Sequence, residues 1–210
     1  MTQKREIQVD PSIYDRKYLD VSRYVTHWHQ ANECATYVGK VGRVLEVGPG
    51  NGHTTWIMRQ WGLQVQTLDL DPALQPDLVG DVSHIPCPDK SFDCVLAAEV
   101  LEHLPWAEFG PTLAELRRVC RGRVVLSLPA PFLGLGLLGQ FTNLGSHGLH
   151  LGLPHWKRHR WDGQHYWEVG KRGTERRVVR RAIRAAGFQI RREFRPAPSL
   201  YCLFFILDVQ

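Results

Sequence analysis

The chain alternates short apolar runs with segments of helical periodicity along most of its length. Apolar runs that suit buried parallel strands lie at 43–47, 64–68, 92–97 and 124–128. Apolar residues at helical spacing follow at 54–61 and 106–120. This alternation predicts an α/β fold, in which helices cover both faces of a mostly parallel sheet.

The two ends of the chain extend this pattern. Residues 13–38 carry aromatic residues and valines at helical spacing, which predicts one or two helices ahead of the sheet. Residues 174–186 predict a helix with an apolar face and an arginine-rich face, ended by Gly187. Two further strands are predicted at 188–194 and 201–207, and the short connection RPAPS between them suits a hairpin.

The region from 130 to 170 has no clear period, although it begins with the apolar run PFLGLGLLGQF. It follows the strand predicted at 124–128. We therefore expect one domain over residues 1–210, in which 1–40 form N-terminal helices and 130–170 form a small insertion that caps the substrate site.

Composition excludes several classes of protein. The chain has 210 residues, 43% of them hydrophobic, which suits one globular domain. No apolar run reaches the roughly 18 residues of a membrane span, and the polar N-terminus predicts no signal peptide. The five cysteines are scattered and form no CxxC pair, which argues against a disulfide framework and a cysteine zinc site. A cytoplasmic location is the simplest interpretation.

The positive charge is concentrated in the C-terminal third. The net charge is +5, and residues 157–192 contain twelve Lys or Arg against three acidic residues. A basic face can meet nucleic acid, a membrane surface or an anionic substrate, or it can simply be a solvated helix face.

Ligands of such sheets bind beyond the carboxyl ends of the strands, and the first of these ends has an unusual composition. The strand runs into GPGNG, where Gly48, Gly50 and Gly52 allow positive φ and close approach of a ligand. Glu46 stands ahead of the glycines. A carboxylate there repels a pyrophosphate and suits a ligand that carries an ammonium group. The spacing GxGxG also differs from the GxGxxG of nicotinamide-dependent oxidoreductases.

Two more carboxylates follow later strand ends. Asp69 comes directly after the second predicted strand, at the separation of about 20 residues expected for a carboxylate that accepts ribose hydroxyls. Its neighbour Asp71 instead looks like the start of a helix with Pro72. Asp81 lies in a loop, where it can accept a hydrogen bond from an exocyclic amine while Val82 donates its N–H to a ring nitrogen. Asp81 can equally be a turn residue that caps the next backbone N–H groups.

The strings VLEVGPGNG, LDLDP and GDVSHIPCPDKSFDCVLAAEVLEHL, in this order, resemble the class I S-adenosylmethionine-dependent methyltransferases over about residues 40–130. The resemblance implies a Rossmann-like seven-stranded sheet with an antiparallel last strand, and S-adenosylmethionine as cofactor, with S-adenosylhomocysteine as product. It also implies a set of cofactor-binding residues: Glu46, Gly48, Gly50, Gly52, Asp69, Leu70, Asp81, Val82 and Glu99. The turn departs from the usual family pattern at Pro49, which removes one backbone donor.

Methyl transfer to an oxygen acceptor needs a base, so the histidines near the strand ends matter. We interpret His165, in GQHYWEVG, as the candidate base. Its expected pocket neighbours are Tyr166, Trp167 and Glu168, and His103 is expected to shape the pocket. The alternative is that these histidines are surface loop residues.

A second group of histidines has metal-like spacing: His147, His150, His155 and His159. No cysteine or carboxylate partner stands beside them in a helical metal motif, so we predict no metal site there.

These observations together predict an S-adenosylmethionine-dependent methyltransferase that acts on an oxygen or nitrogen of a small molecule, for example in a glycan or secondary-metabolite pathway. Two alternatives stay open. One is an RNA methyltransferase that uses the basic C-terminal face, although AAEV stands where an NPPY-like tetrapeptide is expected. The other is a non-catalytic, cofactor-binding regulator. Neither the acceptor nor the oligomeric state follows from the sequence.

Overall fold

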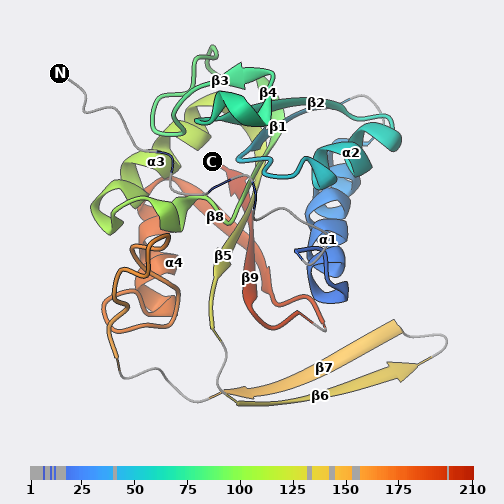
Figure 1. Cartoon of the computed structure of the whole chain (residues 1–210), viewed down its shortest axis with the longest axis vertical. Helices are drawn as coiled ribbons and strands as arrows, with labels where there is room; N and C mark the ends of the chain where they lie inside the picture. The colour runs from blue at the N-terminus through green and yellow to red at the C-terminus, as the bar shows by residue number, and fades with distance from the viewer. Residues whose placement is uncertain are drawn as a thin grey trace.

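The computed structural model describes residues 7, 10, 12, 18–39, 42–131, 134–141, 145–152, 157–197 and 199–210, with the side chains of 134–141 and 145–152 excepted (Figure 1). Its centre is a seven-stranded sheet with the order β3-β2-β1-β4-β5-β9-β8. The strands of this sheet are β1 (Arg43–Val47), β2 (Gln64–Asp69), β3 (Leu78–Val79), β4 (Phe92–Ala98), β5 (Cys120–Pro129), β8 (Phe188–Phe194) and β9 (Cys202–Val209).

The directions of the strands confirm the predicted fold class. The pairs from β3 to β5 are all parallel. The last strand in the chain, β9, inserts between β5 and β8 and runs antiparallel to both, with Leu126 opposite Phe205 in the β5–β9 pair. A short connection of 195–201 suffices because β8 and β9 form a hairpin, as the RPAPS segment predicted.

Helices cover both faces of the sheet (Figure 1). On one face α1 and α2 bury Ala31, Cys34 and Met58 against β1, β4 and β9. On the other face the apolar sides of α3 and α4 bury residues such as Leu113 and Ile183. The helices are α1 (Val21–Val38), α2 (His53–Gln60), α3 (Trp106–Val119) and α4 (Arg176–Ala185), with short 3-10 turns η2 (Pro72–Leu74) and η3 (Leu101–His103). Among the residues that the structure describes, no helix is long and apolar enough to cross a membrane.

Two helix boundaries differ from the sequence prediction. The first helix begins only at Val21, because the side chain of Asp20 accepts the N–H of Arg23 and caps it there. In α2 the buried positions are Thr54, Thr55 and Met58, whereas Trp61, which we expected on this face, is 40% exposed just past the helix end.

The insertion after β5 contains a two-stranded antiparallel ribbon, β6 (Gly134–Phe141) and β7 (Gly145–Gly152), where the sequence showed no clear period. Three of the eight residues of GLGLLGQF are glycine, which weakens the pattern by which a strand is recognised in a sequence. The ribbon leaves the carboxyl end of β5 and extends away from the sheet (Figure 1). Whether 130–170 caps a substrate stays a prediction. The side chains of His147 and His150, and all of His155, lie outside the described residues.

One arginine ties the loop between β3 and β4 to α3. The guanidinium of Arg118 donates to the carbonyls of Ile85 and Cys87, at 2.9 and 2.8 Å, and to the carboxylate of Glu115. Glu115 in turn accepts the N–H of Ile85 at 2.7 Å. These contacts order the loop that begins with Asp81.

We expect Arg118→Met to lower the free energy of unfolding by about 1–3 kcal/mol, because it leaves two carbonyls and a carboxylate without their donor. Urea unfolding followed by circular dichroism measures this change. The matched control is Arg177→Met, since Arg177 is an exposed arginine of α4 and such changes stay within about 0.5 kcal/mol. Equal effects of the two substitutions would contradict the role of Arg118.

Candidate functional site

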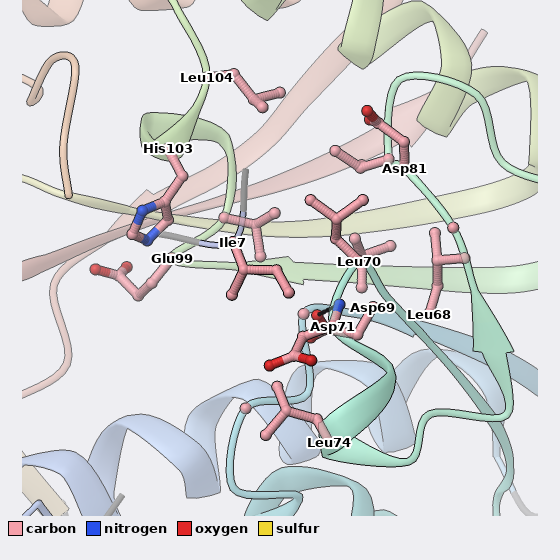
Figure 2. Close-up of a pocket in the computed structure, with 16 residues that line it drawn as sticks. Ile7, Leu68, Asp69, Leu70, Asp71, Leu74, Asp81, Glu99, His103 and Leu104 are labelled. Atoms are coloured by element: carbon pink, nitrogen blue, oxygen red, sulfur yellow. Dashed lines mark hydrogen bonds between the residues drawn. The ribbon is translucent and has the colours of Figure 1, made fainter. Parts of the chain in front are cut away.

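Two cavities meet at the glycine turn after β1. The first, of about 170 Å³, lies beyond the ends of β1, β2 and β4, and residues from Val47 to Leu104 line it (Figure 2). The second, of about 240 Å³, lies between this turn, α1 and the start of β9. Gly48, Gly50 and Glu99 border both cavities. This is the position at which parallel α/β sheets bind their ligands.

The glycine turn requires glycine at its first position. Gly48 has φ 66°, and a Cβ on it would lie 2.5 Å from Cγ2 of Val100. Its N–H donates to the carbonyl of Leu68 at 2.8 Å, which holds the turn against the end of β2. Gly52 lines neither cavity; with φ 70° it forms the N-cap of α2. The turn therefore leaves the backbone of 48 and 50 open to a ligand.

Glu46 lies on β1 below this turn and borders the second cavity. Its side chain is only 4% exposed and accepts a hydrogen bond from the hydroxyl of Thr55. Burial raises the pKa of Glu46 to about 7, against the opposite influences of Thr55 and Arg59. A ligand with a positive group would favour the ionised form of this carboxyl.

Asp69 is the last residue of β2 and lines the first cavity together with Leu70 and Asp71 (Figure 2). Its Oδ1 accepts the N–H of Asp71 at 2.9 Å. Asp71 caps η2 by accepting the N–H of Ala73, as its position before Pro72 predicted. Burial raises the pKa of Asp69 above its usual value. Both carboxylates thus reach the cavity. Asp71 caps η2, whereas Asp69 caps no helix.

The loop with Asp81 and Val82 forms another wall of the first cavity. Asp81 Oδ1 accepts the N–H of Ser83 at 2.8 Å, and its carbonyl accepts the N–H of His84. The turn-capping alternative from the sequence is therefore present. Asp81 also faces the cavity (Figure 2), so capping and ligand contact are compatible.

Glu99 follows β4 in a strained backbone conformation, with φ 54°. Its N–H donates to the carbonyl of Ser127 at 3.1 Å, and its Oε1 accepts the hydroxyl of Ser127 at 3.0 Å. Burial raises the pKa of Glu99 to about 6. Non-glycine residues with positive φ concentrate at functional sites, and this one stands where the two cavities join.

The predicted pocket histidines, His103 and His165, come together. Their rings meet edge to face with centroids 5.2 Å apart, and His103 lines the first cavity. Nδ1 of His103 lies 3.0 Å from the carbonyl of Gln164. Burial, reinforced by the charge of His165, lowers the pKa of His103 to about 4. His103 is therefore neutral at physiological pH.

A carboxylate stands behind the other imidazole. Nδ1 of His165 lies 3.6 Å from Oε1 of Glu168, and the His165 side chain is 15% exposed. Burial lowers the pKa of His165, but Glu168, Asp162 and Glu99 outweigh burial and raise the pKa above its usual value. Glu168 also contacts Nδ1 of His159 at 3.3 Å.

Two predicted pocket neighbours point elsewhere. Trp167 is 2% exposed, donates from Nε1 to the carbonyl of Leu104 and packs against Trp106 and Phe109, so it is a core residue. Tyr166 is 43% exposed and packs on Trp161 with ring centroids 4.4 Å apart. Neither lines the two cavities described above, and neither do His165 and Glu168.

The sequence did not predict the polar wall of the second cavity. Arg23, His27 and Gln30 on α1 face it, with Tyr18 before the helix and Tyr201 before β9. Nδ1 of His27 lies 2.7 Å from the hydroxyl of Thr54. These residues carry no motif, and only the packing of α1 against α2 brings them to the turn.

The raised pKa of Glu46 makes the stability of the protein depend on pH. Such a carboxyl stabilises the fold below its unfolded pKa of about 4.5, and this contribution is lost as the pH rises through about 7. Glu46→Gln keeps an acceptor for Thr55 and stays neutral. We expect the variant to gain stability relative to wild type between pH 5 and pH 8, by up to about 3 kcal/mol. Urea unfolding of both proteins at pH 5 and pH 8 measures the gain. If the difference in unfolding free energy between Glu46→Gln and wild type is the same at both pH values, the raised pKa of Glu46 is excluded.

Comparisons with known proteins agree with this geometry. Residues 45–128 match the family model described as "Methyltransferase domain". No curated protein sequence matches the chain significantly. Among solved structures, 1,6-didemethyltoxoflavin-N1-methyltransferase from Burkholderia thailandensis has a TM-score of 0.66 at 18% identity, over 95% of this chain and 83% of its own.

Two other solved structures share the fold. The glycopeptide N-methyltransferase MtfA, complexed with S-adenosylhomocysteine, has a TM-score of 0.59 at 19% identity, over 86% of this chain and 89% of its own. A SAM-dependent methyltransferase from Aquifex aeolicus has a TM-score of 0.60 at 17% identity, over 96% of this chain and all of its own.

The matched segment contains the glycine turn, Asp69, Asp81 and Glu99, and it contributes β1, β2 and β4 to the sheet edge on which both cavities open. Residues 45–128 are thus similar to a methyltransferase domain, and the seven-stranded sheet shares its fold with the solved methyltransferases.

Proposed function

We propose that this chain is a class I S-adenosylmethionine-dependent methyltransferase, and that it transfers the methyl group to an oxygen or nitrogen atom of a small-molecule acceptor. The observation that carries the proposal is the pair of cavities that join at Gly48 and Glu99. Residues of α1, the glycine turn and the start of β9 line the second cavity, and such a concave space suits a small ligand. Two fold neighbours, the toxoflavin and glycopeptide enzymes, are named for small or peptide-derived acceptors, which supports the same class.

The residues at the cavities fit the cofactor. When bound, S-adenosylmethionine supplies an electrophilic methyl group, so the protein must mainly position the acceptor and exclude water. Asp69 would accept the ribose hydroxyls, and Asp81 with Val82 would face the adenine edge in the first cavity. Glu46 and Glu99 would face the amino-acid part beside Gly48 and Gly50. The buried position and raised pKa of Glu46 fit a partner that carries positive charge.

His165 remains our candidate for the base. The pKa of His165 is raised above that of an ordinary imidazole, which makes it a stronger base, and Glu168 stands beside Nδ1 to hold the positive charge that forms. The charge of His165 also reaches Glu99, at the junction of the cavities. Glu168 would act as a positioning residue through His165.

Asp69→Ala is expected to weaken binding of S-adenosylmethionine by about 1–3 kcal/mol, because the ribose hydroxyls lose their acceptor. Isothermal titration calorimetry measures the affinity. Asp71→Ala is the matched control: it lines the same cavity but caps η2, so it should change thermal stability more than affinity. If Asp71→Ala alone weakens binding, the ribose assignment belongs to Asp71.

His165→Ala is expected to lower kcat about 10²-fold or more on an oxygen acceptor, while the Kd for S-adenosylmethionine stays within about twofold. Radiolabelled cofactor and a panel of small hydroxyl and amine compounds first identify an acceptor. Glu168→Gln should shift the pH dependence of kcat, because the imidazolium loses a carboxylate partner. An unchanged kcat in His165→Ala would remove His165 as the base.

The RNA alternative draws on the basic face of α4. Two of its five arginines, Arg176 and Arg180, pair with Glu193 on β8, which neutralises part of that face. The helix also lies on the face of the sheet opposite α1 and α2, whereas α1 lines the second cavity (Figure 1). The basic helix is therefore away from that cavity, and we favour a small acceptor. Binding of transfer RNA that weakens steeply with salt would reverse this preference.

A further inference from the structure

One buried carboxylate has no visible use in the site as described so far. Glu102 lies on η3, is fully buried, and neither of its oxygens has a hydrogen-bond partner among the described residues. The other acidic side chains near it are paired: Glu99 accepts from Ser127, and Glu168 contacts His159. A buried carboxylate without any partner is costly whether it is ionised or protonated, so it indicates a missing ligand.

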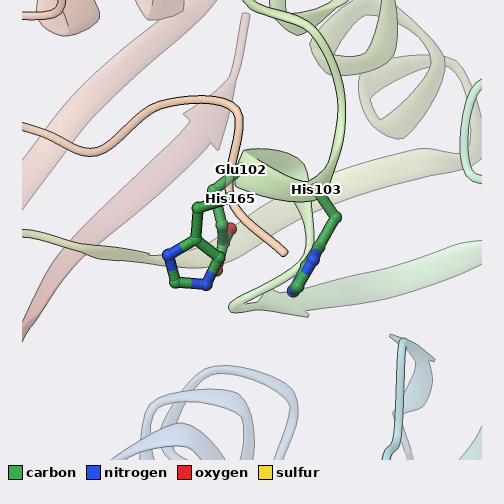
Figure 3. A group of neighbouring side chains, drawn as sticks. All are labelled: Glu102, His103 and His165. Carbon is green, nitrogen blue, oxygen red and sulfur yellow. The ribbon is translucent and has the colours of Figure 1, made fainter. Parts of the chain in front are cut away.

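Two imidazoles converge on this carboxylate (Figure 3). One nitrogen of His103, one nitrogen of His165 and one oxygen of Glu102 lie within 4.8 Å of one another. The three residues come from two segments that are far apart in sequence, η3 and the loop after β7. Their convergence is therefore a product of the tertiary fold.

The outer contact of the His103 ring orients it as a metal ligand. A carbonyl can only accept, so Nδ1 of His103 must carry a proton toward the carbonyl of Gln164, 3.0 Å away, and the lone pair is then on Nε2. This is the usual arrangement of metal-binding histidines, in which one ring nitrogen contacts a carbonyl or carboxylate and the other is turned to the ion. Nδ1 of His165 lies 3.6 Å from the Glu168 carboxylate and, like both oxygens of Glu102, is buried without a hydrogen-bond partner among the described residues.

We propose that Glu102, His103 and His165 bind a divalent transition-metal ion, with Zn²⁺ as the best match to two imidazole nitrogens and one carboxylate oxygen. Around one zinc ion such ligand atoms lie about 3.5 Å apart. The three side chains would therefore close by about 1 Å on binding. A fourth position stays open for water or another oxygen or nitrogen ligand.

A neighbouring group makes a weaker site. His159, Asp162 and Glu168 also lie within ligand distance of one another. Their polar atoms already have partners: His159 Nε2 lies 3.0 Å from the carbonyl of His165, and Asp162 accepts the backbone N–H groups of Gln164 and His165. An ion there would displace existing contacts, whereas an ion at Glu102 would supply absent ones.

The ion would link the turn after β4 to the loop that carries His165. It would lie beside the first cavity, because His103 lines that cavity. With the ion bound, His165 is a ligand and cannot take a proton. The proposal does not depend on the acceptor or on catalysis, since it concerns binding of the metal alone.

The test uses the full-length chain without an affinity tag, stripped with a chelator. His147, His150 and His155 are replaced by alanine in every sample, because these histidines can bind zinc by themselves. Titration calorimetry with Zn²⁺ alone should show one ion per chain in this background. Glu102→Gln and His165→Ala should each weaken binding at least about tenfold, and Co²⁺ should give a visible absorption spectrum that both variants lose.

Asp162→Asn is the matched control, because it makes the same carboxylate-to-amide change in the neighbouring group and keeps Oδ1 as an acceptor. Its zinc affinity should equal that of the background. Circular dichroism checks that each variant folds, and His165→Ala, which lies in a loop, answers the question if Glu102→Gln does not fold. The proposal is overturned if the background binds no Zn²⁺, if Glu102→Gln and His165→Ala bind it unchanged, or if only Asp162→Asn loses binding.

Discussion

The acidic side chains at the carboxyl edge of the sheet are the constraint on which the rest of this structure depends. Glu46 and Glu102 are buried and Asp69 and Glu99 are half-buried, on or after β1, β2 and β4, where a fold optimised for stability alone would place neutral groups. Burial raises the pKa of each of them. The edge is therefore under electrostatic strain that a cationic ligand relieves, and a cofactor with an ammonium and a sulfonium group is such a ligand.

The surrounding structure holds this unfavourable edge in place. Parallel pairing of β3, β2, β1, β4 and β5 brings the strand ends together, and apolar layers from α1 and α2 on one face and α3 and α4 on the other cover the sheet. Arg118 ties the loop that begins with Asp81 to α3 through two carbonyls and Glu115. Stability supplied by the core thus allows a site that is locally destabilising.

The loop after β7 carries the residue that both of our proposals beyond cofactor binding share. It brings His165 against His103 and Glu168, and near Glu102. The same imidazole suits two roles, a proton acceptor held by Glu168 and a ligand of a metal ion beside Glu102. Both roles need the second nitrogen of the ring to face the site, so they exclude each other at any one moment.

The sequence by itself predicted a mostly parallel sheet with helices on both faces, and it placed the glycine turn and Asp69 at the ends of the first two strands, because these features depend on local pattern. Apolar runs specify buried strands, a glycine turn after the first strand specifies close approach, and a carboxylate after the second strand follows at a fixed separation. The antiparallel direction of the last strand also follows from local sequence, since the RPAPS connection is too short for a helical crossover.

Only the tertiary structure decided what surrounds that edge. Trp167, predicted to line a pocket, is buried against Trp106 and Phe109, because burial of an aromatic ring depends on elements distant in sequence. The polar wall from Arg23, His27 and Gln30 exists only because α1 packs beside α2. The meeting of Glu102 with His165 likewise joins residues 63 positions apart, and no local period or motif encodes such a contact.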